Sequence, residues 1–581
     1  MPVNHQTSSL RPLPIIPDHS SETAYEIETR FQLLPLTARI LAVRGFSADD
    51  RLEAYLHPRL ARLEKPDTLA DYEKAITYLA AAVSADETIG IFGDYDTDGI
   101  SSVSLWVLFL RAIKRKSLTR LAHRDRGYGL TAEDVRFFAD AGLRSVIACD
   151  VGSTDHEAAE IAHQLGLELI IVDHHHLQQP YPKAHALINP LRPDCGFPFP
   201  GMASVGLSFY LMAGLRSRLE ADCRIPPADL PELKEYLDIV ALGTLADVSP
   251  LTGNNRILVH HGLRLIAARK RPSIRALCMA AHIDAAEEIT EKHVVFRMTP
   301  KLNAPGRMGD ADLSLQLLTA ADYQESLQIA GELTRINERR QQIQEQMFKE
   351  AVVQAEASMD YRWGIVVSGT DWHPGIVGIV AAKLAEQFKR PAIAIALRGD
   401  IGRGSVRTFA NINIFEVIEK TTGHLISYGG HQGAMDIEIA REQLGDFAMA
   451  FDDQLRVYAG TGDELPTPVD SIVPLHELTS HFMNELKLLS PFGNQNPEPV
   501  LMCRNLEVVS VRYPKNVHVS VRLRDPVTQA VRQAIGFNMA KSQREIGSIV
   551  NIIYVPERNA YNPEGLQLRI LFLWNAEEKN G

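Results

Sequence analysis

Three short apolar segments, each followed closely by an aspartate, restrict the fold of this chain more than any other feature. They are Ile89 to Phe92, Ser145 to Cys149 and Leu169 to Val172, and helical stretches separate them. Such an alternation of strand and helix is typical of a doubly wound parallel sheet. The carboxyl ends of parallel strands lie at one edge of a sheet, where such folds bind ligands. The pattern therefore predicts an α/β domain in which the acids after the strands meet at one site.

The segment after the first of these strands is unusually acidic. It reads Gly93-Asp-Tyr-Asp-Thr-Asp-Gly99, with carboxylates at three alternate positions. Burial and mutual repulsion would raise the pKa values of these acids, and a divalent cation relieves both effects. The alternative is a solvated acidic turn, or an Asp that caps the helix expected from Ser101.

The segments after the other strands favour the metal hypothesis. Asp150 follows the second strand, Asp173-His174-His175-His176 follows the third, and Asp247 ends a further apolar segment. Three consecutive histidines after a strand-terminal Asp are hard to explain by packing alone. Mixed carboxylate and imidazole ligands suit Mn²⁺ or Mg²⁺, and two such ions can clamp the attacking and leaving oxygens of a phosphoryl displacement. The sequence thus predicts two divalent ions per site and phosphoester hydrolysis.

Length and composition set the class of protein. A chain of 581 residues predicts three or four domains, and 45% hydrophobic residues exclude a mainly disordered protein. The net charge of −12 excludes a uniformly basic nucleic-acid-coating protein but allows a local basic channel. No apolar run approaches the roughly 20 residues that span a bilayer, and the start of the chain has no signal-peptide pattern. Five scattered cysteines without CxxC spacing fit a reducing compartment, so we expect a cytoplasmic protein with no membrane partner.

The motifs, taken in order, resemble those of a known superfamily. The DHH phosphoesterase superfamily has motifs similar to 94–99 (DYDTDG), Asp150, 173–175 (DHH) and 243–247 (GTLAD). The segment 299–311 (TPKLNAPGRMGDA) resembles one found in the RecJ single-strand-specific exonucleases. The associated DHHA1 domain carries motifs that resemble 372–375 (WHPG) and 429–431 (GGH). This resemblance extends from about residue 60 to about residue 575.

The pattern and the resemblance together predict an α/β multidomain protein. Residues 322–357 read as one long exposed helix, and Tyr458 to Pro468 is the clearest linker, after which short alternating apolar runs predict a small β-barrel. The expected parts are an N-terminal helical arm (1–60), a parallel-sheet DHH phosphoesterase domain (61–255), a helical connector (256–357), a second α/β domain of the DHHA1 type (358–458) and an OB-fold-like nucleic-acid-binding barrel (468–576).

The resemblance implies roles for individual residues. The positions that match metal ligands are Asp96, Asp98, Asp150, His174 and Asp247. It further implies that Asp150 lies between the two ions, that Asp94 is an additional essential acid, and that His175 stabilises charge at the scissile phosphate. Two departures stand out. Phe92 occupies a position where many relatives have a metal-binding His, and Asp94 could compensate for the loss of that ligand. The GGH motif continues into 432–436 (QGAMD), whereas relatives usually have a small Ala-Gly pair there.

Basic residues and glycines indicate where a nucleic-acid strand would bind. A basic tract, 111–126, leads into 127–130 (GYGL), a segment also seen in RecJ-like chains, although a solvated helix face is an alternative. The segment 401–409 (IGRGSVRTF) places arginines beside glycines that permit close approach to a phosphate. Arg307 is expected in a turn between two glycines, where it could bind phosphate or, alternatively, Asp310 or Asp312. The candidate substrate-binding residues are Arg124, Arg126, Tyr128, Asn303, Arg307, Arg403, Ser405, Arg407 and His431.

The predicted barrel has its own basic character. Residues 504–533 contain six Lys or Arg and two acids, and the strand pattern resembles an OB-fold, whose usual ligand is a single strand. Tyr513 and Phe537 could stack on bases, although a place in the core is the simpler explanation for either.

The acidic motifs predict a metal-dependent phosphodiesterase, and the resemblance to the RecJ family implies a 5′-to-3′ exonuclease that degrades single-stranded DNA to nucleotides in DNA repair and recombination. The resemblance also implies a single-stranded-DNA-binding protein and a helicase as partners, and we expect a monomer. Two alternatives remain open. A DHH-family oligoribonuclease or cyclic-dinucleotide phosphodiesterase would lack the barrel and the 299–311 segment. A non-catalytic replication scaffold would have lost its metal ligands, nearly all of which are present here.

Overall fold

The computed structural model describes residues 11–18, 20–124, 129–358, 362–409, 412–458, 464–540, 545–559 and 565–576. Contacts divide the chain into two compact units. The α/β unit comprises Glu64–Ser249 and His261–Thr461, and the barrel unit comprises Met1–Leu63, Pro250–His260 and Gly462–Gly581. Each unit is therefore assembled from segments that are distant in sequence.

The first sheet of the α/β unit is parallel, as predicted. Its five strands have the order β3-β2-β4-β5-β6. They are β2 (Ile89–Gly93), β3 (Ser117–Leu121), β4 (Ser145–Cys149), β5 (Glu168–Val172) and β6 (Ala186–Ile188). The chain adds β3 on one side of β2 and β4 on the other, so the strand order switches between β2 and β4. In open α/β sheets, ligands bind outside the carboxyl ends of the strands at such a switch point.

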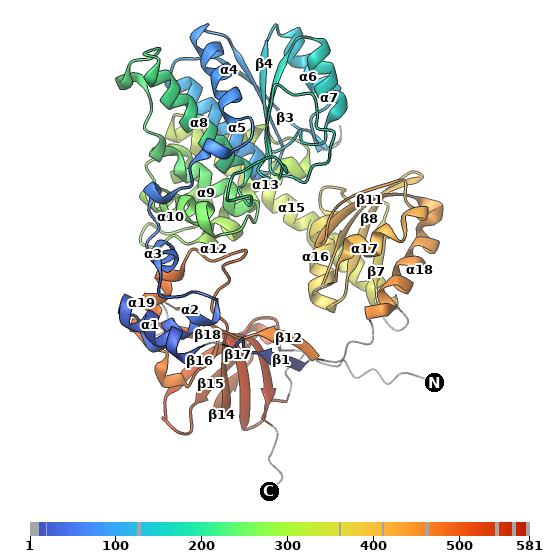
Figure 1. Ribbon diagram of the computed structural model, residues 1–581. Helices are drawn as coiled ribbons and strands as arrows, with labels where there is room; N and C mark the ends of the chain where they lie inside the picture. The colour runs from blue at the N-terminus through green and yellow to red at the C-terminus, as the bar shows by residue number, and fades with distance from the viewer. Residues whose placement is uncertain are drawn as a thin grey trace. The chain divides into compact units, whose positions relative to one another are not determined.

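Helices cover both faces of this sheet (Figure 1). One face carries α6 (Ala132–Asp140) and α7 (His156–Gln164), and the other carries α4 (Tyr72–Ser84), α5 (Thr97–Ala112) and α8 (Ser204–Ala221). Every residue of β2 and β4 is buried, which is why both strands read as continuous apolar runs. Phe92 is fully buried in the core that the sheet forms with Val135 and Phe138 of α6.

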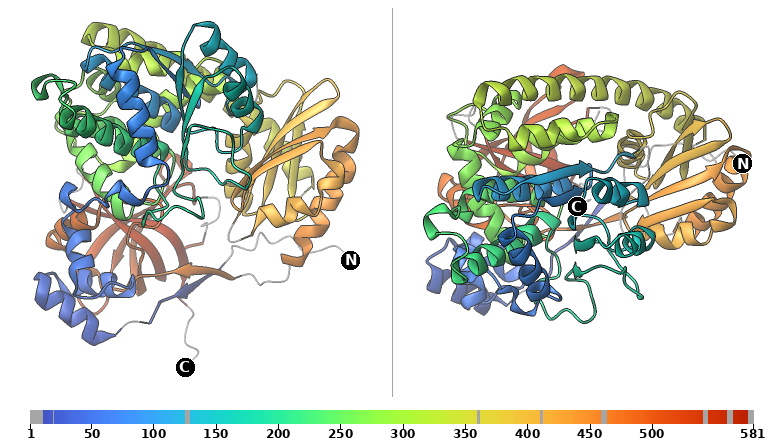
Figure 2. Two further views of the ribbon diagram at one scale, coloured as in Figure 1. Left: turned by 45° about the horizontal axis from the view of Figure 1, so that its top comes forward. Right: turned by 90° about the horizontal axis from the view of Figure 1, so that it is seen from above.

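A run of helices follows this domain. It comprises α9 (Leu237–Ala246), α10 (Gly253–Ala268), α11 (Pro272–Ala280), α12 (Glu291–His293), a π-helical turn (Val294–Met298), α13 (Thr299–Met308), α14 (Asp312–Thr319) and α15 (Tyr323–Ser358). The predicted long helix is confirmed as α15, whose 36 residues correspond to about 54 Å of helix. Its expected exposure is wrong for one side of the helix, where Ala330, Leu333 and Ala351 are buried (Figure 2). It packs against α11 and α13 and, further along, against the second α/β domain.

The second α/β domain is built on a mixed sheet of order β10-β11-β9-β8-β7. Its strands are β7 (Ile365–Gly369), β8 (Ala392–Arg398), β9 (Ile401–Arg407), β10 (Ser427–His431) and β11 (Ala434–Ala440). The β7–β8 pair is parallel and the remaining pairs are antiparallel. Helices α15 and α16 (Val377–Phe388) form a core with one face, and α17 (Ile414–Glu419) and α18 (Leu444–Leu455) form a core with the other.

The barrel unit confirms the predicted C-terminal barrel. The strands are β13 (Ser471–Ile472), β14 (Leu501–Arg512), β15 (Val519–Arg524), β16 (Val531–Gly536), β17 (Ile549–Arg558) and β18 (Leu566–Asn575). The strands have the order β14-β15-β16-β18-β17, and the pairing of β17 with β14 closes them into a barrel. Helix α19 (Ser480–Leu489) contributes its apolar face to the core of the barrel.

The N-terminal arm belongs to the same core as the barrel. Its helices are α1 (Ser21–Phe31), α2 (Pro35–Val43) and α3 (Asp50–Leu56), and buried residues of all three pack with the barrel strands. Strand β1 (Arg11–Ile15) pairs in parallel with β12 (Glu464–Pro468). Part of the expected linker is thus a strand, and residues 459–463 of that linker lie outside the described residues.

One arginine connects the segments of the barrel unit. Arg256 is 2% exposed and donates hydrogen bonds to the carbonyls of Tyr55, Leu488, Leu489 and Pro491, at 2.8 to 3.4 Å. Its guanidinium also lies 4.0 Å from the ring centroid of Tyr55. These contacts join the short segment Pro250–His260 to the arm and to the turn that follows α19.

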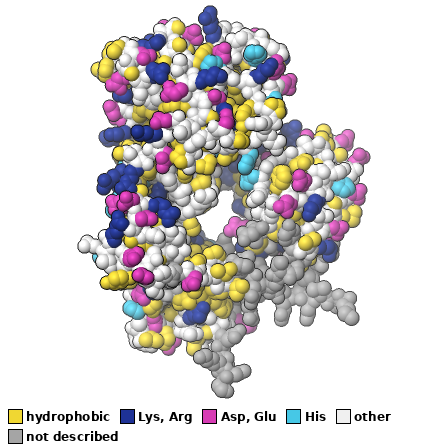
Figure 3. Space-filling model, viewed as in Figure 1, with side chains coloured by type: hydrophobic (Ala, Val, Ile, Leu, Met, Phe, Trp, Pro, Cys, Tyr) yellow, Lys and Arg dark blue, Asp and Glu magenta, His cyan; other side chains and the backbone are white. Residues whose placement is uncertain are grey.

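The surface carries charged side chains of both signs. On the face seen in Figure 3, basic and acidic side chains are interspersed. No helix among the described residues has both the length and the apolar character needed to cross a membrane. All five cysteines are free thiols.

Candidate two-metal active site

The acidic segment after β2 lies at the switch point of the sheet. The Asp94 N–H donates to the carbonyl of Cys149 at 3.3 Å, which keeps the segment beside the end of β4. Asp96 is the N-cap of α5, and its Oδ1 accepts the N–H groups of Asp98 and Gly99 at 2.9 and 3.1 Å. A Cβ on Gly99 would lie 2.6 to 2.9 Å from the backbone of Asp94, so only glycine permits this tight turn. Asp96 is therefore a helix cap, as the alternative interpretation of the acidic segment expected. These two hydrogen bonds use only one of its carboxylate oxygens, so the other could bind a metal ion.

Asp98 is held by a different helix. Its two carboxylate oxygens accept the N–H groups of Ser204 and Val205 at 2.8 and 3.0 Å, at the start of α8. A helix N-terminus stabilises a carboxylate because its first N–H groups are free and its dipole is positive there. Asp98 is 1% exposed, so the two helices fix its side chain in a buried position.

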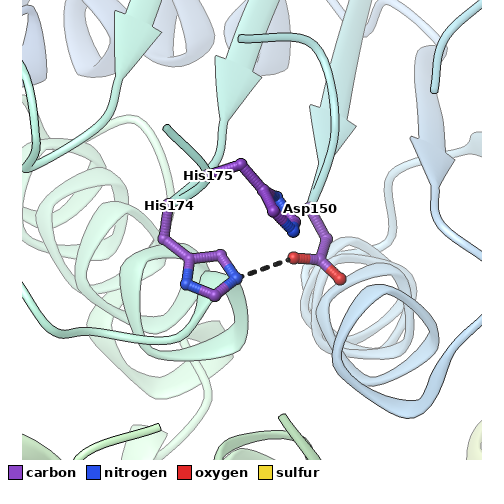
Figure 4. A group of neighbouring side chains, drawn as sticks. All are labelled: Asp150, His174 and His175. Carbon is purple, nitrogen blue, oxygen red and sulfur yellow. Dashed lines mark ion pairs between the residues drawn. The ribbon is translucent and has the colours of Figure 1, made fainter. Parts of the chain in front are cut away.

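Asp150 leaves the end of β4 in a strained conformation. Its φ of 64° lies in the left-handed region, which is costly for a residue with a Cβ and recurs at functional sites. Asp150 Oδ1 is 3.2 Å from Nε2 of His174 (Figure 4). The same nitrogen lies 3.7 Å from Asp247 and 3.9 Å from Asp98. One imidazole nitrogen thus faces three carboxylates that come from β4, the end of α9 and α5.

Asp173, at the end of β5, orients both histidines that follow it. Its Oδ1 accepts the N–H groups of His174 and His175 and lies 2.7 Å from Nδ1 of His175. Burial alone would raise the pKa of Asp173, but its contacts with His175 and the nearby His174 hold that pKa below its ordinary value. The reverse holds for His175: burial opposes its charge, but Asp173 raises the pKa of the imidazole to about 9. Asp173 had no role in the sequence analysis, although its place before the paired histidines was a signal.

We expect Asp173→Asn to reduce kcat by about 10- to 100-fold, because partners that orient a reacting or ligating His contribute this much. One carboxylate oxygen of Asp173 accepts three hydrogen bonds, and the other accepts the N–H of Ser153. An asparagine has only one acceptor oxygen, so it cannot keep all four. Steady-state kinetics and a melting curve would check the effect. Asp238→Asn is the matched control, since it removes a buried carboxylate bound to Arg271 in the same unit. An unchanged kcat in Asp173→Asn would contradict the orienting role.

The structure brings all seven predicted metal and catalytic residues together. Three groups have ligand atoms within 4.8 Å of one another. They are Asp94 with Asp96 and Asp150, Asp98 with His174 and Asp247, and Asp150 with His174 and His175. Asp150 and His174 each belong to two groups, and Asp150 is the acid that the resemblance places between two ions.

The electrostatics of the cluster favour bound cations. Burial, followed by the charges of neighbouring acids, raises the pKa of Asp98 and of Asp150 well above the ordinary range and that of Asp94 to about 8. The buried Oδ1 atom of Asp94 has no hydrogen-bond partner among the described residues. Asp150 Oδ1 and His174 Nε2 are 3.2 Å apart as an ion pair, but within the described chain neither makes a hydrogen bond. Hard oxygen ligands with one imidazole match the preferences of Mg²⁺ and Mn²⁺. The residues present therefore fit two divalent ions.

Phe92 contributes nothing to this cluster. Its side chain is fully buried in the core on the side of α6. Asp94, two residues later, is a member of the group with Asp96 and Asp150. The geometry is consistent with Asp94 supplying the ligand that the missing imidazole would provide.

The candidate substrate-binding residues of the first domain and of α13 differ in the groups that they contact. The guanidinium of Arg124 lies 4.5 Å from the ring centroid of Tyr95, within the acidic segment. Asn303 accepts the hydroxyl of Thr97 at 2.7 Å, which ties α13 to the start of α5. Arg126 and Tyr128 lie outside the described residues. The basic tract is not a single helix face, because it spans the end of α5, strand β3 and the loop after it, and Arg120 pairs with Glu133 and Asp134.

The turn predicted around Arg307 is wrong, because the residue lies in the last turn of α13. Gly306 permits helix packing there, since a Cβ would lie 2.5 Å from the carbonyl of Tyr95. Arg307 Nη1 is 3.4 Å from the carbonyl of Gly375. Burial and the charges of Arg124 and Arg340 lower the pKa of Arg307 to about 10. No ion pair joins Arg307 to Asp310 or Asp312 in the described part of the chain, so its cationic surroundings favour an anionic ligand.

A second group of candidates lies on β9 and β10. Arg403, Ser405 and Arg407 alternate along β9 and so share one face of the sheet. Ser405 is buried, Arg407 Nη1 donates to its Oγ at 2.7 Å, and Arg403 pairs with Glu438 at 3.4 Å. His431, at the end of β10, is exposed, and its pKa is lowered by partial burial and by Arg407, His176 and His175. The pKa of His431 thus depends in part on the charges of the histidines that follow β5.

The barrel presents exposed basic and aromatic side chains. Tyr513 and Phe537 are 39% and 50% exposed, so their assignment to the core is wrong. Arg504, Arg512, Lys515 and Arg522 are also exposed. Arg532 instead donates to the carbonyl of Leu478 and supports the barrel.

Comparison with known proteins agrees with this geometry. Residues 88–244 match the N-terminal domain of the DHH family, residues 362–456 match the DHHA1 domain, and residues 469–571 match the RecJ OB domain. The single-stranded-DNA-specific exonuclease RecJ of Dickeya dadantii is 33% identical, over 94% of this chain and 97% of its own length. RecJ of Bacillus subtilis is 30% identical, over 92% of this chain and 67% of its own length.

Solved structures show the same likeness. The crystal structure of Thermus thermophilus RecJ in complex with Mn²⁺ matches with a TM-score of 0.83 and 26% identity, over 98% of this chain and 80% of that one. The Mg²⁺ complex of the same protein matches with a TM-score of 0.77. With its acidic cluster, its three matching domains and its full-length relatives, the chain belongs to the RecJ family of single-stranded-DNA-specific exonucleases.

Proposed function

We infer that the protein is a metal-dependent exonuclease that degrades single-stranded DNA to nucleotides. The observation that carries this inference is the cluster of buried carboxylates and one imidazole at the switch point of the first sheet, in a chain of this family. We propose that degradation runs from the 5′ end and serves DNA repair and recombination. Family membership supports both statements.

The proposed roles follow from the geometry of the side chains. Two divalent ions, Mn²⁺ or Mg²⁺, would be held by the acids and His174 of the three ligand groups and would supply a nucleophile and neutralise phosphate charge. His175, oriented by Asp173, would donate a hydrogen bond to the charge that develops on the phosphate. Arg124, Arg307, Ser405 and Arg407 would bind the phosphates of the strand.

The alternatives are less well supported. An oligoribonuclease or cyclic-dinucleotide phosphodiesterase has no need of a barrel with exposed arginines and aromatics, and here that barrel matches the RecJ OB domain. A non-catalytic scaffold would not retain buried acids that repel one another, since without metal they only destabilise the fold.

Digestion of end-labelled strands tests the function directly. We expect release of nucleotides from the 5′ end of single-stranded DNA in Mn²⁺ or Mg²⁺, slower digestion of RNA, and no reaction in excess EDTA. Release from the 3′ end would overturn the proposed polarity. Equal activity on dinucleotides and long strands would favour the small-substrate alternative.

The exposed cations of the barrel provide a further prediction. Because the barrel shares its core with the N-terminal arm, deletion after Gly462 would expose apolar helices, and surface substitutions are the better test. We expect Arg512→Gln/Lys515→Gln/Arg522→Gln to flatten the dependence of log K on log salt by about 2, at roughly 0.7 per lost phosphate contact. Arg59→Gln/Arg62→Gln, two exposed arginines of the same unit, is the control. An unchanged salt slope in the triple variant would indicate that the barrel binds a protein instead.

We propose further that the protein acts as a monomer in the cytoplasm, with a single-stranded-DNA-binding protein and a helicase as partners. Family membership supports these partners, and free cysteines support a reducing compartment. Sedimentation equilibrium tests the monomer, and co-purification with each partner tests the interactions.

A further inference from the structure

The candidate anion site of the second α/β domain contains an acid. Asp436 of β11 is paired with Ser405 of β9, and the Ser405 hydroxyl donates to Asp436 Oδ1 at 2.6 Å. The same hydroxyl oxygen accepts from Arg407 Nη1 at 2.7 Å. A carboxylate is therefore connected through one serine to the arginine that we expect to bind phosphate. It belongs to the segment 432–436, where the motif departs from its usual continuation.

The surroundings of Ser405 and Arg407 are otherwise those of an anion site. A Cβ on Gly378, in the first turn of α16, would lie 2.8 Å from Arg407 Nη2 and 3.1 Å from Ser405 Oγ. Both side chains thus lie against the N-terminal turn of α16, whose N-cap makes no side-chain hydrogen bond. The N-terminal turn of a helix, a guanidinium and a hydroxyl together form a good phosphate site.

Close contacts place this site near the metal cluster within the α/β unit. Gly375, just before α16, lies against the backbone of Arg307, and Gly306 lies against Tyr95 of the acidic segment. A strand with its scissile phosphate at the metals would therefore bring its terminal group toward Ser405, Arg407 and Asp436.

We propose that Asp436 determines which strand ends the enzyme accepts. Its carboxylate repels a terminal 5′-phosphate at Arg407 and occupies the Ser405 hydroxyl that such a phosphate would use. A terminal 5′-hydroxyl instead donates a hydrogen bond to Asp436. The chain therefore prefers 5′-hydroxyl ends more strongly than it would without this acid. This proposal rests on the proposed exonuclease function.

The position of Asp436 suits a clean test. The side chain is exposed, so Asp436→Asn removes the charge without opening the core and keeps an acceptor for Ser405. Glu438 is the matched control, because it is two residues along the same strand, on the same face, and pairs with Arg403 at 3.4 Å. Glu438→Gln makes the same change in net charge, but Glu438 is opposite Arg403 rather than Ser405 and so is two residues further along β11 from Arg407.

The experiment measures kcat and KM on one oligonucleotide with either a 5′-phosphate or a 5′-hydroxyl. We expect Asp436→Asn to lower KM for the phosphorylated end about five- to tenfold, because one partly exposed like charge is removed. KM for the hydroxyl end should stay the same or rise, kcat should change little, and Glu438→Gln should leave the ratio of the two KM values unchanged.

The outcomes separate the proposals. An unchanged ratio in Asp436→Asn, or an equal shift in Glu438→Gln, would overturn the role of Asp436 while leaving the exonuclease intact. A wild-type protein inactive on both ends would instead overturn the proposed function. Introducing Arg407→Gln should abolish the effect of Asp436→Asn, since the two groups act on the same phosphate.

Discussion

Replacing Asp150 with asparagine is expected to lower the hydrolysis rate by roughly a thousandfold or more, since losing several kcal/mol of stabilisation from the metal ions has that effect. Asp150 belongs to two of the three ligand groups and lies 3.2 Å from His174, so its loss affects both ion positions. Strand binding should remain close to that of the wild type, because Arg124, Ser405 and Arg407 are unchanged. A binding assay and a nuclease assay at saturating Mn²⁺ would measure both properties.

The same substitution should change stability in a metal-dependent way. In excess EDTA, we expect Asp150→Asn to melt at a higher temperature than the wild type, because burial and neighbouring acids make the ionised carboxylate unfavourable. In Mn²⁺ the order should reverse, since the wild type gains more from binding the ions. Asp322→Asn, which alters an exposed acceptor of two backbone N–H groups, is the control. Substantial hydrolysis by Asp150→Asn would falsify its assignment as a shared ligand.

Arg256→Ala is expected to destabilise the barrel unit by about 3–5 kcal/mol, which places it among the most damaging single changes. The substitution removes the arginine donor from the carbonyls of Tyr55 and Leu488 and the cation from the face of Tyr55. The carbonyls of Leu489 and Pro491 lose one donor but keep the side chain of Asn496. Buried carbonyls without donors carry the full cost of their lost hydration. Arg256→Lys should lose less, because it keeps the charge but cannot reach all the acceptors.

Hydrogen exchange of the barrel strands during denaturant unfolding would report on this unit. Arg59→Ala is the control, since that arginine is exposed. A loss below about 1 kcal/mol in Arg256→Ala would be typical of a surface position and would contradict the role inferred for it.

The metal cluster could be predicted from sequence because its members follow strands. Once Ile89 to Phe92 and Ser145 to Cys149 are taken as parallel neighbours, the switch-point rule brings Asp94 and Asp150 together. Asp436 could not be assigned in this way, because its contact with Ser405 depends on the register between β9 and β11. Sequence patterns do not specify the register of strands that pair across an intervening helix.

Arg307 shows a different limit. Glycines on both sides suggested a turn, yet α13 continues through Gly306 because close packing against Tyr95 requires a residue without a side chain. The low helix propensity of glycine was outweighed by packing against Tyr95, a residue more than two hundred positions away in sequence. Tertiary packing commonly overrides local propensity in this way. The common core of the arm and barrel could not be predicted either, because it depends on contacts between segments that are far apart in sequence.

That shared core has a consequence for synthesis on the ribosome. Apolar residues such as Ile27, Leu41 and Leu52 reach their partners only when Val473 and the later strands have been made. Roughly 400 residues separate the two sets, which at about 5–20 residues per second is a delay of roughly 20–80 s. During that interval the α/β unit can fold around its own cores, while helices α1 to α3 remain without theirs. We therefore expect the nascent arm to keep its apolar faces exposed to water until the barrel strands have been synthesised.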